Sequence, residues 1–203
     1  MSDIGAVFPM FYLPPVEYFT RLNQHKPGIL VEKHEHLIKQ TYRNRAHIYS
    51  PDGMLALTVP VIKGSKVHTS VQEVKISYDF KWQRLHWMSL QVCYRRSAYF
   101  EYYEDDFARF YENQFEYLFD YNEQLLRMIM GMVKLKTDLQ FTTEYQRDYP
   151  GVADYRHSFS AKKDSEVEQK PYFQVFEERK GFIKNLSIVD LLFNQGPQSI
   201  NYL

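Results

Sequence analysis

Ionisable side chains are concentrated between residues 32 and 63, in a segment whose other residues have the composition of β-strands. Because alternate side chains of an extended chain share a face, Arg43, Arg45 and His47 are predicted to project together. Two guanidinium groups two residues apart would stand roughly 6 to 7 Å apart along the strand. This spacing suits a diphosphate or a pair of carboxylates, so the segment is the first candidate for a binding site.

Four residues of this segment are predicted to contact an anionic ligand. Arg43 and Arg45 would bind its charged oxygens together with Lys63 at the far end of the hairpin. Asn44 would face a developing oxyanion. The alternative is structural, because the arginines could instead brace the sheet through ion pairs with two nearby acidic residues, Glu32 and Glu35.

A general base is the next requirement of group-transfer chemistry, and His86 is the candidate. Its alternative role is that of a helix histidine satisfied by a buried carbonyl or carboxylate beside Trp82 and Trp87. Cys93 lies two helical turns after His86, roughly 10 Å away, which is too far for direct activation. We therefore assign Cys93 to the hydrophobic core.

His34 and His36 share one face of an extended segment and are a possible pair of metal ligands. A third ligand is not evident, and the sequence contains neither an HExxH nor a CxxC pattern. No metal site is predicted.

Composition limits the classes of protein to which the chain can belong. Its 203 residues suit one domain, and the single cysteine together with the absence of a secretory leader predicts a cytoplasmic location. No apolar run approaches the roughly 18 residues of a membrane span. The 25 basic and 25 acidic residues leave no net charge to attract nucleic acid, so charge recognition must be local.

The first half of the chain has the pattern of a mixed α/β protein. Apolar runs at residues 6–11 and 28–32 flank a helix that begins near Pro14, which predicts a parallel strand–helix–strand start. Tyr12 lies in the turn after the first run, where open α/β sheets bind ligands, although it could also simply fix that turn. Strands at 44–49 and 54–62 are predicted to form an antiparallel hairpin.

The second half is mainly helical. After a half-buried strand at residues 71–76, helices are predicted at 82–100 and 105–115 and after a capping box formed by Asp120 and Glu123. A strand at 139–143 is followed by residues 146–170, which are predicted to form a mobile surface loop. A closing helix has Ser187 as its N-cap, and its Asp190 is expected to form a structural ion pair, for instance with Arg45.

Several motifs occur in a characteristic order along nearly the whole chain. They are FYLPPVEYF, YRNRAHI with LTVPVIKG, KWQRLHW with YRRSAYF, and PYFQVF with NLSIVDLLFNQGP. In these motifs the chain resembles the WbqC-like family, specifically its short Bacteroidetes-type members. Glu32 stands where that family usually has an aspartate after the second strand, and the resemblance implies a ligand-binding role for it.

The resemblance implies a cytoplasmic α/β protein of surface-polysaccharide (O-antigen-type) biosynthesis, with aminoacyl or acyl transfer to an activated amino sugar as its suggested activity. A nucleotide sugar or acyl-coenzyme A would then be the phosphate-bearing substrate. The alternative is a non-catalytic module that binds a nucleotide sugar or a partner protein of the same pathway. Its contact area would be aromatic, with Tyr99, Phe100, Tyr102 and Tyr103. A nucleotidyltransferase-like enzyme is disfavoured because no HxGH pattern is present.

Overall fold

The computed structural model describes residues 4–26, 28–38, 40–62, 69–161, 165 and 167–203. Strand β1 (Ala6–Pro9), helix α1 (Val16–His25) and strand β2 (Ile29–Glu32) form the predicted parallel start. The two strands pair from Ala6 opposite Ile29 to Pro9 opposite Glu32. The helix forms here because its apolar residues recur at helical spacing, which buries Val16, Phe19 and Leu22 on one face.

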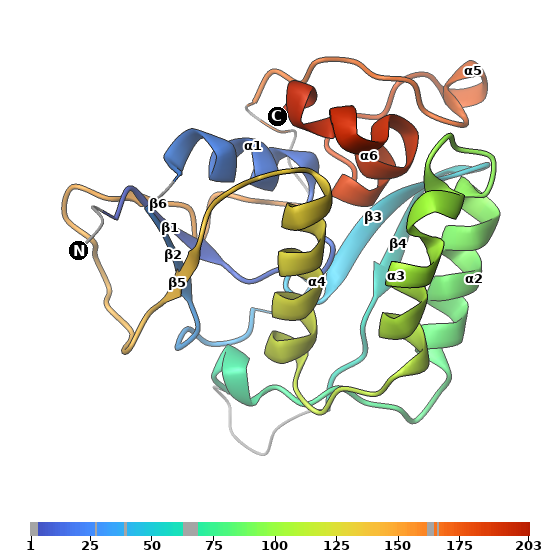
Figure 1. Cartoon of the computed structure of the whole chain (residues 1–203). Coiled ribbons are helices and arrows are strands. Elements are labelled where there is room, and N and C mark those ends of the chain that lie inside the picture. Colours follow the sequence, from blue (N-terminus) through green and yellow to red (C-terminus); the bar gives the residue numbers. More distant parts are fainter. Residues whose placement is uncertain (1–3, 27, 39, 63–68, 162–164, 166) are drawn as a thin grey trace.

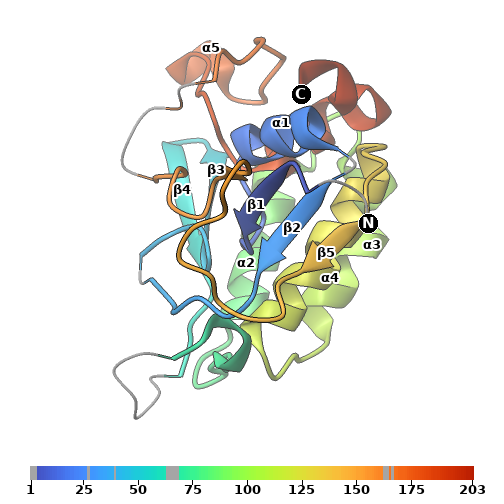
Figure 2. The ribbon, with the colours of Figure 1, turned by 90° about the vertical axis from the view of Figure 1, so that its left-hand side faces the viewer.

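Two later strands complete a four-stranded parallel sheet. Strand β5 (Leu139–Phe141) pairs with β2, and the short strand β6 (Ala153–Asp154) pairs with β1. The order is therefore β5-β2-β1-β6, and the face of this sheet is visible in Figure 2. All four carboxyl ends lie at one edge, which we call the carboxyl edge. Chain order reverses between β1 and β6, and such a switch point is where parallel sheets commonly bind ligands.

The predicted antiparallel hairpin consists of β3 (Arg45–Ser50) and β4 (Gly53–Thr58). Gly53 ends its turn with a positive φ of 111°, a conformation that glycine adopts without strain. The predicted α/β class is confirmed, with a parallel start, an antiparallel hairpin and flanking helices. The parallel and antiparallel strands belong to two separate sheets.

The strand predicted at residues 71–76 is wrong. Val71–Glu73 form a 3₁₀ helix, η1, and the following residues make only isolated bridges, between Val61 and Ile76 and between Lys75 and Tyr117. Val71 and Val74 are both buried, and their spacing of three residues matches the period of a 3₁₀ turn better than the period of a strand.

Three helices follow, with bounds that differ from the prediction. They are α2 (Trp82–Tyr94), α3 (Phe100–Glu112) and α4 (Leu118–Met132). Helix α2 ends early because Ser97 closes a turn, its amide and hydroxyl both donating to the carbonyl of Tyr94. The predicted capping box does not form, since α4 starts at Leu118 and Asp120 lies within its first turn.

The chain ends with α5 (Glu177–Lys180), α6 (Ile188–Gln195) and the 3₁₀ helix η2 (Gly196–Tyr202). Ser187 caps α6 as predicted, because its hydroxyl accepts the amide hydrogen of Val189 at 3.4 Å. Residues 146–170 contribute β6, and the described part of this segment includes two buried side chains, those of Arg156 and Phe159. The mobility of this segment stays a prediction.

In Figure 1, helix α4 lies next to the parallel sheet and α2 and α3 lie farther from it, and Figure 2 shows the β3–β4 hairpin to one side of the sheet. Helices α1 and α6 lie across one end of these layers. The core between them is rich in aromatic rings, among them Phe8, Tyr18 and Phe107, each fully buried. Within the described ranges, none of the helices combines the length and the apolar character needed to cross a bilayer.

Candidate functional site

Five charged side chains gather at the carboxyl edge of the parallel sheet, and we call them the sheet-edge cluster. They are Glu32, Glu35, Arg43, Asp154 and Arg156. Glu32 is the last residue of β2 and Asp154 is the last residue of β6, so strand ends position both. Four of the five are at least 95% buried, whereas the Asp154 side chain retains 35% of its exposure.

Arg156 is the centre of this cluster. Its guanidinium forms a fork with Asp154, with Nε at 3.0 Å from Oδ1 and Nη2 at 2.6 Å from Oδ2. Nη1 lies 3.4 Å from Oε2 of Glu32, which joins β6 to β2 across the end of β1. Burial alone would raise the pKa of the Asp154 carboxyl, but the hydrogen bonds and charge of Arg156 outweigh it and lower that pKa.

Glu32 is fully buried and accepts two hydrogen bonds besides its contact with Arg156. Its Oε1 accepts from the hydroxyl of Thr142 at 2.9 Å and from the amide of His34 at 2.7 Å. Because Thr142 follows β5, the carboxylate connects β5, β2 and β6 at one edge. A carboxylate in this position is already desolvated and held by donors, as ligand-binding carboxylates generally are.

Arg43 pairs with Glu35, as the structural alternative anticipated for this arginine. Nε and Nη2 both donate to Oε1, at 3.0 and 2.7 Å, and Nη2 also donates to the carbonyl of Arg156 at 3.2 Å. The pair is thereby connected to the rest of the sheet-edge cluster. Arg45 is half-buried in β3, where its Nε donates to the Thr58 hydroxyl at 3.3 Å, so the two arginines have separate contacts.

The remaining predicted ligand contacts of this segment are dispersed. Asn44 donates through Nδ2 to the carbonyl of Val59 at 2.9 Å, and its Oδ1 is buried with no partner among the described residues. Lys63 lies outside the residues that the structure describes. Their roles as ligand contacts stay predictions.

Tyr12 and His86, two of the predicted site residues, are brought together in a second polar group. The Tyr12 hydroxyl lies 3.0 Å from Nδ1 of His86 and 3.0 Å from the hydroxyl of Tyr111. Burial lowers the pKa of His86 to about 4, and a hydrogen bond to the backbone of Thr58 opposes this shift only in part. The imidazole is therefore neutral at neutral pH, and it accepts a proton only weakly.

Asp190 differs from its prediction. It is fully buried and accepts hydrogen bonds from three neutral donors, the hydroxyls of Tyr94 and Tyr172 and the amide of Gln174, at 2.9, 2.7 and 2.8 Å. The expected ion pair with Arg45 is wrong, because Nε of Arg45 donates to the hydroxyl of Thr58 instead. Burial raises the pKa of Asp190 to about 6 against these hydrogen bonds. Cys93 is buried, as assigned.

The two histidines considered for metal binding have different surroundings. His34 is held through Nε2 by the carbonyl of Thr142 and through Nδ1 by the amide of Gln72, each at 3.2 Å. His36 is exposed and pairs through its backbone with Ser70. In the described part of the chain, His, Cys, Asp and Glu side chains form no group of three or more that could hold a metal ion.

The predicted aromatic contact area is largely internal. Phe100 is fully buried and Tyr103 is 4% exposed, so neither offers surface to a partner. Tyr102 is 75% exposed, and Tyr99 is half-buried. The prediction of a surface made of all four rings is therefore wrong, because Phe100 and Tyr103, about one turn apart on α3, lie on the helix face that packs into the core.

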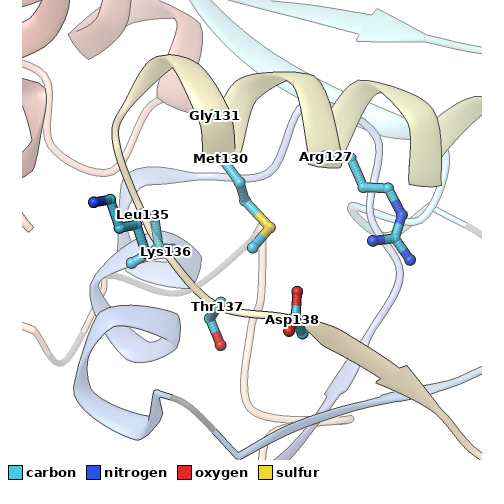
Figure 3. A pocket seen from close by; sticks show the side chains of 7 residues that line it. All are labelled: Arg127, Met130, Gly131, Leu135, Lys136, Thr137 and Asp138. Atoms are coloured by element: carbon cyan, nitrogen blue, oxygen red, sulfur yellow. The ribbon is translucent and has the colours of Figure 1, made fainter.

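A hollow of about 480 Å³ lies at the opposite end of the sheet, between the end of α4 and the start of β5. Figure 3 shows Met130 and Arg127 extending from α4 toward the segment that carries Lys136 and Asp138. Arg127 is paired with Glu123 at 2.8 Å on its own helix. The charged side chains that line the hollow, from Arg127, Lys136 and Asp138, are exposed rather than buried, so the sheet-edge cluster is the better candidate.

Sequence reasoning missed Asp154 and Arg156. Both lie in the segment that was interpreted as a mobile loop, and β6 is too short to show strand periodicity. The available signal was the spacing, because an aspartate and an arginine two residues apart share a face of an extended chain. Many other charges in the same segment hide that signal.

Comparison with known proteins places these features in a family. The model of the WbqC-like protein family matches residues 10–163, a range that contains the whole sheet-edge cluster, Tyr12 and His86. An uncharacterized protein of Mycobacterium tuberculosis, Rv1507c, is 25% identical over 226 residues, covering 98% of this chain and 96% of the relative. No solved structure matches. The chain belongs to the WbqC-like protein family.

Proposed function

We propose that this protein binds an activated amino sugar at the sheet-edge cluster and acts as an acyl- or aminoacyltransferase of surface-polysaccharide biosynthesis. One observation carries the proposal: buried charges converge at the carboxyl edge of a parallel sheet, beside the switch point between β1 and β6. Buried ion pairs add little to stability compared with apolar residues of the same volume. Their concentration at the edge where such sheets bind ligands therefore supports a binding role.

The charge of the cluster indicates the class of ligand. Three carboxyl groups, from Glu32, Glu35 and Asp154, face two guanidinium groups, from Arg43 and Arg156. This excess of acceptors suits the amine and hydroxyl donors of an amino sugar. Arg45, which is less buried than Arg43, would contact the phosphates of the activated substrate.

Acyl transfer joins the sugar nitrogen to the acyl carbon, expels the donor's leaving group and releases one proton from the nitrogen. In our proposal His86 accepts this proton through Tyr12, whose hydroxyl bonds the imidazole just after β1 ends. The low pKa of His86 makes proton uptake unfavourable at neutral pH, so this step would be slow.

The second candidate is a module that binds the activated sugar without transforming it. The burial of His86, which is 6% exposed, favours this alternative, because a base must be reached by the proton it abstracts. The two functions differ in one measurement. A transferase must release free coenzyme A from an acyl-coenzyme A donor in the presence of an amino sugar, and Tyr12→Phe must slow that release while the fold survives.

Binding is tested by isothermal titration with glucosamine 1-phosphate and with glucose 1-phosphate, which lacks the amine. We expect measurable binding of the amino sugar and at least ~10-fold weaker binding of glucose 1-phosphate, equivalent to about 1.4 kcal/mol. Glu32→Gln should weaken the amino-sugar complex by a similar factor. The matched control is Glu123→Gln, which alters a surface ion pair on α4. Equal affinity for both sugars, or no binding of either, would contradict the proposal.

A further inference from the structure

Residues 143–152 connect β5 to β6 and run along the outside of the parallel sheet, on the side away from α4 (Figure 1). We call this segment the strap. The side chains of residues 143–148 are all exposed, so the strap is not anchored by a hydrophobic core of its own. Its contacts with Arg156 are therefore important for its position.

Arg156 contacts both the backbone carbonyls and the tyrosine rings of the strap. Nη1 donates to the carbonyl of Gln146 at 2.7 Å, and Nη2 donates to the carbonyl of Arg147 at 2.8 Å. The rings of Tyr145 and Tyr149 lie against the guanidinium, with centroids 5.3 and 4.9 Å from its central carbon. One buried side chain thus contacts four residues of the strap.

The same guanidinium has no donor left for a ligand. An arginine has five N–H groups, and here they are directed at Asp154, Glu32 and the two strap carbonyls. Asp154 gives the guanidinium a charged partner in a two-bond fork, whereas each strap carbonyl is a neutral acceptor of a single bond. The strap carbonyls are consequently the partners that a competing ligand replaces first.

Glu32, the central carboxylate of the proposed site, lies beneath the strap. It is fully buried, and the guanidinium of Arg156 contacts both groups: Nη1 lies 3.4 Å from Oε2 of Glu32, and the central carbon lies 4.9 Å from the centroid of the Tyr149 ring. A sugar cannot reach Glu32 while Tyr149 occupies this place. The closed strap and an occupied site exclude one another.

We propose that Arg156 is a latch, which closes the strap over Glu32 and transfers its two strap-directed N–H groups to the sugar hydroxyls when the ligand enters. The inference rests on the proposed function for the identity of the ligand, but the latch itself can be tested without any ligand. Arg156 is a positioning residue in this scheme, because it controls access to Glu32. Ligand entry then requires the strap to open rather than to close.

Trypsin provides a direct measure of strap opening. The Arg147–Asp148 bond lies within the strap, and its carbonyl is one of the two that Arg156 holds. Cleavage at this bond is compared, by mass spectrometry of the intact protein, with cleavage after the exposed Lys184, which corrects for trypsin activity and for global unfolding. The ratio of the two rates is the quantity measured.

We expect Arg156→Gln to raise this ratio at least ~10-fold. Tyr145→Ala, which removes a half-exposed ring and leaves the core intact, should raise it by a smaller factor. The matched control is Tyr102→Ala, an exposed tyrosine on α3, which should leave the ratio unchanged. An unchanged ratio in both Arg156→Gln and Tyr145→Ala would overturn the latch. If Arg156→Gln unfolds, Tyr145→Ala decides alone.

The ligand arm uses wild-type protein and saturating glucosamine 1-phosphate. The ratio should rise several-fold with this sugar and remain unchanged with glucose 1-phosphate. Calorimetric binding of glucosamine 1-phosphate without any increase in the ratio would refute ligand entry through the strap. Absence of calorimetric binding would instead refute the proposed function, and the variants would still decide whether Arg156 is a latch.

Discussion

Asp190 allows a quantitative test of the structure through the pH dependence of stability. The carboxyl group is fully buried in α6, and its partners are neutral hydroxyl and amide groups rather than a cation. Its ionised form is therefore costly in the folded state. Asp190→Asn removes the ionisation and keeps a side chain of nearly the same size and shape.

The magnitude follows from the shift in pKa. The folded protein holds the pKa of Asp190 at about 6, against roughly 3.9 in an unfolded chain, and each unit corresponds to about 1.36 kcal/mol. A carboxyl whose folded pKa is raised stabilises the protein below its unfolded pKa, and this stabilisation is lost as the pH rises through the folded value. The wild type should thus lose about 3 kcal/mol across this window, of which roughly 2 to 2.5 kcal/mol falls between pH 4 and pH 7.5.

The assay is urea unfolding of the wild type and of Asp190→Asn at pH 4 and pH 7.5. Other groups titrate in both proteins, so the informative quantity is the change with pH in the difference between their free energies of unfolding. Asp106→Asn, at an exposed position of α3, is the control and should give no such change. If the difference between wild type and Asp190→Asn is the same at both pH values within about 0.5 kcal/mol, Asp190 is not a buried carboxyl with a raised pKa.

Two further predictions concern the sheet edge and the end of α6. Arg43→Gln should lower the free energy of unfolding, measured in urea, by about 3 to 5 kcal/mol, because it leaves the Glu35 carboxyl buried without its partner. Adding Glu35→Gln should recover most of this loss. A double variant no more stable than Arg43→Gln would contradict the buried ion pair. Gly196→Ala should lower the free energy of unfolding by about 2 kcal/mol or more, because φ is +52° and a Cβ would overlap the Tyr99 ring. Gly181→Ala, where φ is +74° and the space around the glycine is open, should lower it by only about 1 kcal/mol. Equal melting temperatures of the two variants would refute this prediction.

The elements that sequence predicted well are those whose signals are local. The strand–helix–strand start depends on Pro14 and on apolar spacing within about 30 residues, and the Ser187 cap depends on its immediate neighbours. The end of α2 was mislocated because a turn at Ser97, rather than a proline or glycine, stops the helix. Local patterns do not contain that information.

The candidate site was predicted only in part for a related reason. Glu32 and Arg43 were selected from their own segment, and both lie in the sheet-edge cluster. Arg156 was missed because its contact with Glu32 spans 124 residues of sequence. Whether Arg43 binds a ligand or only Glu35 depended on burial, which a single sequence does not specify.

The strand order of the parallel sheet has a consequence for synthesis on the ribosome. Strands β1 and β2 are complete by Glu32, but their outer neighbours, β5 and β6, begin only at Leu139 and Ala153. At about 5 to 20 residues per second, the nascent chain waits roughly 5 to 20 seconds with both edges of its first strand pair unpaired. Unpaired edges recruit other chains, so newly made protein should depend on chaperones in this interval more than its finished fold suggests.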